Sequence, residues 1–308
     1  MMPNLTTIAV AGLGMMSAVP AFCANSARPG TVNYIEGAAY LNGQQLTGKS
    51  VGSTDLNPGE ELSTQTGKAE ILLTPGVFLR LDDNSEVKMI SPDLTKTQVE
   101  LEHGRAGIEV DEIYPQNNLD ILDAGVTTQL VKNGYYEFNA DQPTAMVFDG
   151  KAAVEVGDGK YRVVKSHHEL ALVSGPGDKR LANEKPASFN TDEAKDDLYN
   201  WNSLRSQYLA EANNQIAGEY VGGPGFAPGW YWDPYMWDYT FIGMGPFYSP
   251  FGWGFYPYGW YGGGYGGLYG YRGIGRVGGP VHGFAGGGFH GGAGVGGGFH
   301  GGGGGGHR

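Results

Sequence analysis

The sequence has few groups that could catalyse a reaction or cross-link the chain. Its 308 residues include one cysteine, Cys23, so no disulfide can form within the chain. It contains no Gly-x-Ser-x-Gly motif, no phosphate-binding loop and no His-Glu-x-x-His motif. We therefore expect a protein that is not an enzyme, and we predict no catalytic residue, no cofactor and no metal site.

Positive charge is scarce as well. The chain has 20 Lys and Arg against 32 Asp and Glu, a net charge of −12 at pH 7. An acidic protein repels phosphate backbones, so nucleic acid is not an expected partner. Long apolar runs are missing after the N-terminal segment, which predicts no later transmembrane helix. The expected partner is a protein or a glycan of the cell envelope.

The N-terminal 24 residues are typical of an export signal. The segment from Leu5 to Phe22 is uncharged and mostly apolar, and small residues precede a cleavage point after Cys23 or Ala24. An uncleaved membrane anchor is the alternative. The bulky Phe22 before Cys23 argues against a lipoprotein anchor. Residues 1–24 are therefore predicted to be a signal peptide, and the protein is predicted to be exported to the periplasm, cell envelope or cell surface.

Residues 28–180 show the period-two pattern of short β-strands. Apolar residues alternate with polar ones in segments such as 69–73, 77–81 and 99–102, where Glu70 and Arg80 stand between apolar neighbours. Turn dipeptides bound these segments: Asn42-Gly43, Pro75-Gly76, His103-Gly104, Asn133-Gly134, Asp149-Gly150 and Asp158-Gly159. The pattern predicts an all-β domain, built as a short-strand β-sandwich, a β-roll or a short solenoid.

The same region resembles the FecR domain family. The residues that carry the resemblance follow one another in the family's order: 56–71, with Gly59-Glu60 and a Thr-x-x-Gly turn before a strand; 74–81, with Pro75-Gly76 and Arg80-Leu81; Asn84-Ser85; 99–106; and 147–154. The resemblance covers residues 30–175. It departs from the family at Gly134-Tyr135, where the family often has Gly-Thr, and at His167-His168-Glu169, where it often has Ala-Gly-Glu.

The FecR resemblance implies the fold and an extracytoplasmic role in binding a partner, without catalysis. Members anchored in the membrane carry a cytoplasmic region that restrains a sigma factor, and this sequence has no room for that region before Asn25. Our first hypothesis is therefore an exported, non-enzymatic cell-envelope protein whose β domain is a platform for binding a protein or ligand and whose Gly/aromatic tail is a sticky extension. The alternative hypothesis is an extracytoplasmic signalling component that regulates a sigma factor or reports on iron transport.

One amphipathic helix is predicted over residues 190–218. Asn190 and Glu193 have the spacing of a capping box, and Gly218 is a natural C-terminal stop. Apolar residues recur at steps of three and four: Leu198, Trp201, Leu204 or Arg205, Tyr208, Ala212 and Ile216. We expect this stripe to pack on the β domain or on a neighbour, and docking of a partner is the alternative.

Residues 219–308 form a low-complexity tail that is predicted to be largely disordered. They contain 35 of the 55 glycines and five of the six tryptophans, and glycine offers no side chain to a core. Two hypotheses stay open for the aromatic part: it folds back over the β domain, or it adheres to the envelope or matrix. Candidate partner-binding residues on the helix and tail are Trp201, Tyr208, Trp230, Trp232, Trp237, Trp253 and Trp260.

The remaining polar constellations are interpreted as structural. His167 and His168 are adjacent, so on a strand they point to opposite faces and form no common site. The segment 82–85 lacks the length of a calcium-binding loop and reads as a hairpin turn. The tail histidines, His282, His290, His300 and His307, are spaced too widely for a defined metal site.

Overall fold

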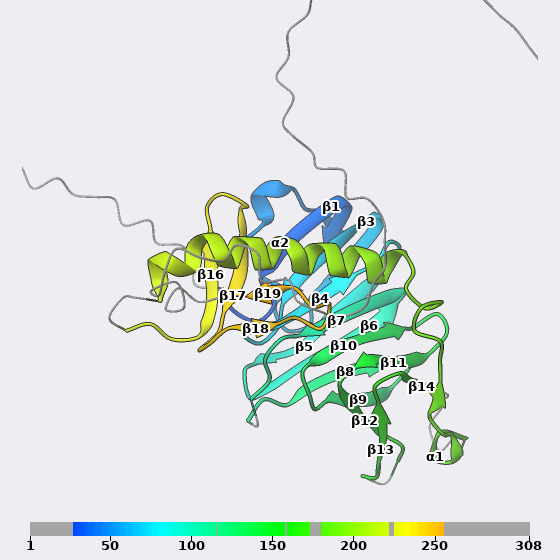
Figure 1. The fold of residues 1–308 in the computed structure, drawn as a ribbon. Coiled ribbons are helices and arrows are strands. Elements are labelled where there is room, and N and C mark those ends of the chain that lie inside the picture. The colour runs from blue at the N-terminus through cyan, green and yellow to red at the C-terminus, as the bar shows by residue number, and fades with distance from the viewer. Residues whose placement is uncertain (1–26, 115, 158, 173–179, 222–224, 256–308) are drawn as a thin grey trace, which may run out of the picture. The chain divides into compact units, whose positions relative to one another are not determined.

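The computed structural model describes residues 27–114, 116–157, 159–172, 180–221 and 225–255. In these residues the chain is mostly β, with one long helix, α2 (Asp197–Tyr220), lying across a large sheet (Figure 1). The predicted all-β class is therefore confirmed. No helix in the described ranges is long and apolar enough to span a membrane. The predicted signal peptide lies outside them.

Fifteen of the described strands form one continuous sheet that extends to both sides of its longest strand, β3 (Glu61–Leu72). On one side follow β4 (Val77–Leu81), β7 (Arg105–Val110), β10 (Gly134–Asn139), β11 (Thr144–Asp149), β14 (His168–Ala171) and β15 (Ala187–Ser188). On the other follow β5 (Glu86–Asp93), β6 (Lys96–His103), β8 (Leu119–Asp123), β9 (Val126–Leu130), β12 (Lys151–Glu155) and β13 (Tyr161–Lys165). Strand β1 (Val32–Leu41) pairs with β3 and with β2 (Gln44–Gln45), and a 3-10 turn, η1 (Gly48–Ser50), comes next.

The sheet curls so that its two halves share one hydrophobic core. Leu79 of β4 and Ile108 of β7 belong to the same buried cluster as Val99 of β6 and Val154 of β12. Strands β6 and β10, from opposite halves, also contact each other. All the described pairs are antiparallel except β6 with β8, which is parallel. Of the predicted architectures, a β-roll describes this arrangement best.

Several of the turns predicted from the sequence are confirmed between consecutive strands. Asn42 and Gly43 both have positive φ angles, 49° and 76°, between β1 and β2. Gly104, between β6 and β7, has φ 69°, and a Cβ there would lie 2.2 Å from the Ser85 hydroxyl. The 82–85 segment is a turn, as predicted, with Asn84 at φ 47°, but it is not a hairpin turn, because the strands it joins, β4 and β5, both pair with β3 and not with each other. These turns set the strand registers that give the sheet two distinct faces.

Helix α2 differs from its prediction at both ends. It begins at Asp197, where Asp196 is the N-cap and accepts the backbone N–H groups of Leu198 and Tyr199. Asn190 instead donates to the Glu193 carboxylate in a turn before the helix. The helix continues past Gly218 to Tyr220. Asp196 caps the helix in place of Asn190 because its carboxylate accepts two backbone N–H groups that have no partner within the helix.

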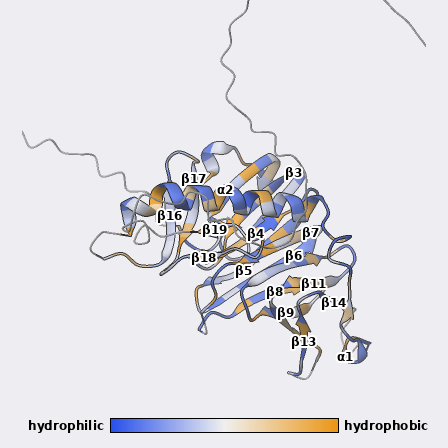
Figure 2. Cartoon of the chain, viewed as in Figure 1, coloured by the Kyte–Doolittle hydropathy of each residue, from blue (hydrophilic) through white to orange (hydrophobic). Residues whose placement is uncertain are grey.

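The buried face of α2 is also more polar than predicted. Leu204 and Tyr208 are exposed, whereas Arg205 and three further polar residues are buried: Asn202, Ser206 and Asn213. Figure 2 shows hydrophilic residues along much of this helix. Leu198, Trp201, Leu209, Ala212 and Ile216 supply the apolar contacts. The helix packs on its own β domain, as expected, but against a surface that is itself polar.

Residues 225–255 correct the prediction of a largely disordered tail. They form two hairpins, β16 (Gly229–Asp233) with β17 (Asp238–Ile242), and β18 (Phe247–Tyr248) with β19 (Gly254–Phe255). Both hairpins contact α2 (Figure 1). Their aromatic rings pack with Leu72, Phe78 and Leu209 in a second core cluster. Aromatic side chains supply the buried area that glycine cannot, so this part follows the fold-back hypothesis. Residues 256–308 lie outside the described ranges.

Gly107 on β7 lets α2 approach the sheet closely. A Cβ at this position would lie 2.6 Å from the Tyr135 hydroxyl and 2.7 Å from the Asn202 side-chain oxygen. We expect Gly107→Ala to lower the unfolding free energy by about 1–3 kcal/mol, because α2 must shift or the side chains must leave their rotamers. Urea unfolding followed by circular dichroism measures this. Gly229→Ala, at a glycine with no atom within 4 Å, is the control and should change little; equal effects would contradict the close approach.

Candidate functional site

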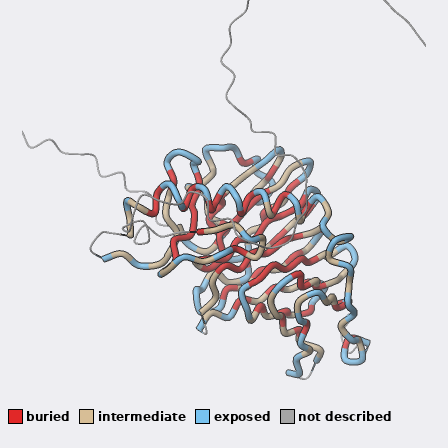
Figure 3. The backbone as a smooth tube through the Cα atoms, in the orientation of Figure 1, coloured by how far each residue is buried: buried red, intermediate tan, exposed pale blue. Residues whose placement is uncertain are grey.

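Alternate residues of β3, β4 and β7 place charged side chains under α2. Glu70 on β3 is paired with Arg80 on β4, and Glu109 lies on the next strand, β7, where it is paired with Phe78; the three charged residues are fully buried. Figure 3 shows the buried positions concentrated on the strands beneath this helix. An alternating strand normally turns its polar residues to water. Here α2 and the β16–β17 hairpin cover them instead, which the sequence pattern did not reveal.

These residues form a buried charge cluster that consists of Glu70, Arg80, Glu109, Arg205 and Asp238. Arg80 Nε lies 2.6 Å from Glu70 Oε2, and its Nη1 lies 2.6 Å from Glu109 Oε2. Arg205 of α2 bridges Glu70 at 3.1 Å and Asp238 of β17 at 3.0 Å. The cluster therefore joins the sheet, the helix and the hairpin through charge-assisted hydrogen bonds.

Neutral groups satisfy much of what remains in the cluster. Ser206 Oγ donates to Glu109 Oε1, and Asn33 Nδ2 donates to Glu70 Oε1 at 2.7 Å. The Arg205 guanidinium stacks over the Tyr34 ring at 4.0 Å. Burial raises the pKa of Glu70, but Arg205 and Arg80 outweigh it and hold the pKa at about 2. Glu70 is thus a permanent anion between two cations.

The charge cluster is sealed from solvent, which limits its chemistry. Its five side chains are between 0 and 4% exposed. A catalytic group must reach its substrate within hydrogen-bonding distance, and these groups are already committed to one another. The arrangement can hold elements together and fix their relative orientation, and it offers no place for a reacting molecule.

A second polar node surrounds Arg105 at the N-terminal end of α2. Arg105 Nη2 lies 2.6 Å from Asp196, the helix cap, and 3.1 Å from Glu137 of β10. The Tyr135 hydroxyl donates to the other Glu137 oxygen at 2.8 Å. Burial raises the pKa of Glu137 to about 7, more than Tyr135 and Arg105 lower it. In contrast to the charge cluster, this node borders open hollows in the surface.

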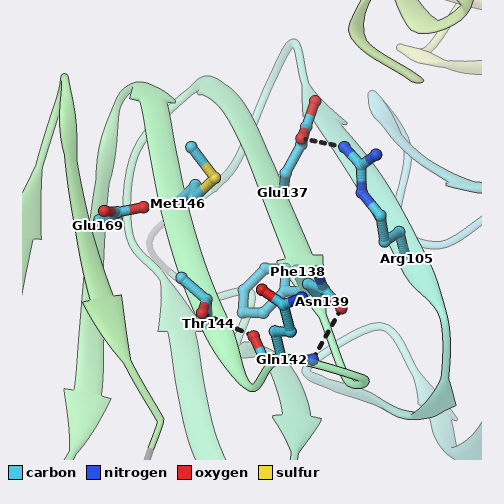
Figure 4. A pocket seen from close by; sticks show the side chains of 8 residues that line it. All are labelled: Arg105, Glu137, Phe138, Asn139, Gln142, Thr144, Met146 and Glu169. Atoms are coloured by element: carbon cyan, nitrogen blue, oxygen red, sulfur yellow. Dashed lines mark hydrogen bonds and ion pairs between the residues drawn. The ribbon is translucent and has the colours of Figure 1, made fainter. Parts of the chain in front are cut away.

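One hollow beside Arg105 lies on the outer face of β10, β11 and β14. Its volume is about 230 Å³. Figure 4 shows Arg105 reaching toward Glu137 on one side, while Glu169 and Met146 lie on the other. The lining residues are Arg105, Glu137, Phe138, Asn139, Gln142, Thr144, Met146 and Glu169. The resulting site is small, partly open and mixed in polarity, and none of its residues was a sequence candidate.

One group of carboxylates has metal-like spacing. Oxygen atoms of Glu61, Glu86 and Glu102 lie within 4.8 Å of one another on adjacent strands. Lys88 Nζ lies 2.7 Å from Glu61 and 3.6 Å from Glu102. A cation of the chain thus already pairs with two of these three carboxylates, and we interpret the group as a surface ion-pair network.

The sequence candidates for partner binding separate into buried and exposed residues. Trp201 is nearly buried and donates to Glu36 at 3.0 Å. Trp253 donates to Ser203 at 3.3 Å, and Trp230 and Trp232 pack against the second core cluster. Tyr208 is partly exposed at 39%, and Trp237 is 71% exposed at the β16–β17 turn. Trp260 lies outside the described residues.

Comparison with known proteins adds little to this geometry. No protein-family model matches the chain, and no curated protein matches it. Two crystal structures of a "putative anti-sigma factor" from Parabacteroides distasonis ATCC 8503 are similar in part, each with 13% sequence identity and a TM-score of 0.33. The match covers 42% of this chain and 59% of that one, less than two thirds of its length. A likeness of this size carries no argument about structure or function.

Proposed function

We propose that the protein is an exported, non-enzymatic protein of the cell envelope, in which a FecR-like β domain holds a binding surface rigidly. The observation that carries this proposal is the exposed turn of the β16–β17 hairpin. Three of its four residues, which we call the aromatic tip, are Tyr235, Met236 and Trp237, and they are 73%, 36% and 71% exposed. Large aromatic side chains contribute most of the energy in many protein interfaces, because each buries a large area.

The aromatic tip stands on a firmly anchored base. Asp238, the first residue of β17, is held by Arg205 of the charge cluster. The Tyr239 N–H donates to Asn33 Oδ1 at 2.7 Å, and Thr240 Oγ1 donates to the Leu209 carbonyl at 2.6 Å. A rigid anchor presents its side chains without a large loss of conformational entropy on binding. The charge cluster therefore serves a binding function by positioning the hairpin.

Trp237 itself adopts an unusual backbone conformation. Its φ angle is +57°, and its N–H donates to the Asp233 carbonyl at 2.9 Å. Its ring and that of Trp232 are nearly perpendicular, with centroids 6.1 Å apart, and Trp232 packs over Gly52. A bulky residue at positive φ costs about 1–3 kcal/mol, and such strain gathers at functional sites. The strain supports a functional reason for holding Trp237 outward.

A binding role is supported over catalysis because the ionisable residues clustered under α2 are buried, where a substrate could not reach them. The alternative, extracytoplasmic signalling, is favoured by one observation. The residues that resemble the FecR family form the β3–β4 hairpin and the β6–β7 and β11–β12 turns, and Arg80 of that resemblance is the hub of the charge cluster. The two functions differ in partner: outer-envelope or wall material for the first, an inner-membrane transducer for the second.

Site-specific photo-cross-linking in cells tests the proposal. A benzoylphenylalanine in place of Tyr235 or Trp237 should form a covalent adduct with a wall, glycan-bearing or outer-envelope component. The control position is Tyr161 on β13, which is 56% exposed and should form no such adduct. Trp237→Ala should reduce capture through position 235 about tenfold, with an unchanged circular dichroism spectrum.

Each result decides between the hypotheses. Capture of an inner-membrane regulator or transporter at the tip would establish signalling in place of an envelope-binding role. Equal adducts at positions 161 and 235 would show that the tip has no special role, and the absence of any adduct would contradict the binding function.

A further inference from the structure

Two hollows near the N-terminal end of α2 share Arg105 as a lining residue. The smaller is the 230 Å³ hollow on β10, β11 and β14 (Figure 4). The larger, of about 870 Å³, lies between the start of α2, the β4–β5 turn, and β1 with β3. Its lining residues are Glu36, Gly37, Thr66, Gly67, Lys68, Asp82, Asp83, Arg105, Asp196, Asp197 and Trp201. We call the pair the Arg105 groove.

Acidic side chains outnumber basic ones in the Arg105 groove by seven to two. Both bases are engaged within the chain: Lys68 pairs with Asp82, and Arg105 pairs with Asp196 and Glu137. Four carboxylates have no ion-pair partner in the described part of the chain: Glu36, Asp83, Asp197 and Glu169. They occur on both sides of Arg105. The groove therefore has an excess of negative charge that its own cations do not neutralise.

A second feature of the groove is one aromatic side chain, Trp201, of which 9% is exposed. Trp201 contributes to the lining of the larger hollow, and its Nε1–H donates to Glu36, which fixes the ring. Lys68 Nζ lies 5.7 Å from the centroid of this ring. The face of an indole attracts cations, and the geometry is already used by a cation of the chain itself. Carboxylates around an aromatic face are the chemistry that recognises ammonium and guanidinium groups.

We propose that the Arg105 groove binds an extended segment of a partner protein that carries separated Lys or Arg residues, one in each hollow. Charge complementarity selects this occupant, and a segment that crosses Arg105 can place its cations against Glu169 on one side and Asp83 and Asp197 on the other. The proposal rests on the binding role proposed above, but it concerns a surface separate from the aromatic tip.

Fluorescence anisotropy on the full chain tests this proposal with a labelled peptide of alternating lysine and glycine. We expect binding that weakens as salt rises from about 50 to about 200 mM, because part of the interaction is screened. Asp83→Asn combined with Asp197→Asn should weaken it about tenfold, since both side chains are exposed and lack a cation. Glu169→Gln in the other hollow should weaken it several-fold.

The matched control is Glu155→Gln combined with Glu211→Gln, which makes the same change in net charge on β12 and on α2, outside the groove lining. This control variant should bind the peptide with an affinity within about twofold of that of the native chain. Equal weakening by both double variants would assign the effect to overall charge and overturn the site. If an equal concentration of spermine displaced the peptide, the ligand of the groove would be a small amine and not a protein segment, and the proposal would be wrong. Failure of the peptide to bind would refute the groove while leaving the aromatic tip unaffected, and the tip's cross-linking result is independent of these variants.

Discussion

Replacing Arg80 with methionine is expected to lower the unfolding free energy by about 3–5 kcal/mol. The change leaves Glu109 buried with one neutral donor, Ser206, and removes one of the two cations that contact Glu70. An unpaired buried carboxylate must either be desolvated as an anion or take up a proton, and both are unfavourable near neutral pH. A loss of this size is a large part of the 5–15 kcal/mol by which domains are typically stable.

Urea denaturation at neutral pH measures the Arg80 effect, with tryptophan fluorescence and circular dichroism as separate probes. Arg80→Met together with Glu109→Gln should recover part of the loss, because the uncompensated charge is gone. Arg28→Met is the matched control, since Arg28 is 69% exposed in its pair with Asp55 and should cost less than about 1 kcal/mol. Similar losses at Arg80 and Arg28 would contradict a buried clamp.

Stability is expected to fall as pH rises from about 5 to about 8. Burial raises the pKa of Asp123 and of Glu137 to about 7, and that of Asp238 to about 6. A carboxyl group with a raised folded-state pKa contributes stability that is complete below its unfolded pKa and is lost as pH rises through the folded value. Glu70 acts in the opposite sense below about pH 4.5, because its pKa is lowered to about 2. The maximum should therefore lie near pH 4, where the losses from the raised groups begin.

Among these three groups, Asp123 has the largest rise in pKa, and Asp123→Asn removes its contribution. Asp123 ends β8, is fully buried and has no ion-pair partner in the described ranges. The variant should be more stable than the native chain by about 2–4 kcal/mol at pH 8 and no more stable at pH 4, because only the ionised carboxylate is penalised. Unfolding free energies from urea titrations across this pH range measure the effect.

The control for Asp123 is Asp197→Asn, at an exposed aspartate, whose effect should stay within about 0.5 kcal/mol at every pH. A stability curve that is flat between pH 5 and 8, or an Asp123→Asn variant that gains nothing at pH 8, would show that the buried carboxyl groups do not control the profile.

Much of the β domain could be predicted from local patterns. The alternation at 69–73 and 77–81 placed Ile71 and Leu79 on the core face correctly, and the Gly and Asn turns marked the hairpins. The candidate site could not be found in this way. Glu70, Arg80 and Glu109 have the same alternation whether water or a helix covers them, so period two alone cannot distinguish the two environments. A faint signal existed in α2, where Asn202, Ser206 and Asn213 recur at helical spacing near Arg205 and form a polar stripe.

The amino-acid sequence by itself determined the all-β class, the positions of the tight turns, the existence of one helix before the aromatic region, and the acidic character of the chain. These properties depend on neighbours a few residues apart. Only the tertiary structure decided which face of the sheet α2 covers, that residues 225–255 fold against it, and that Arg105 stands between two hollows. Those outcomes depend on contacts between residues far apart in the sequence, such as Arg205 with Asp238, which are 33 positions apart, and Glu70 with Arg205, which are 135 apart. Desolvation makes each buried charge depend on partners that no local pattern can identify.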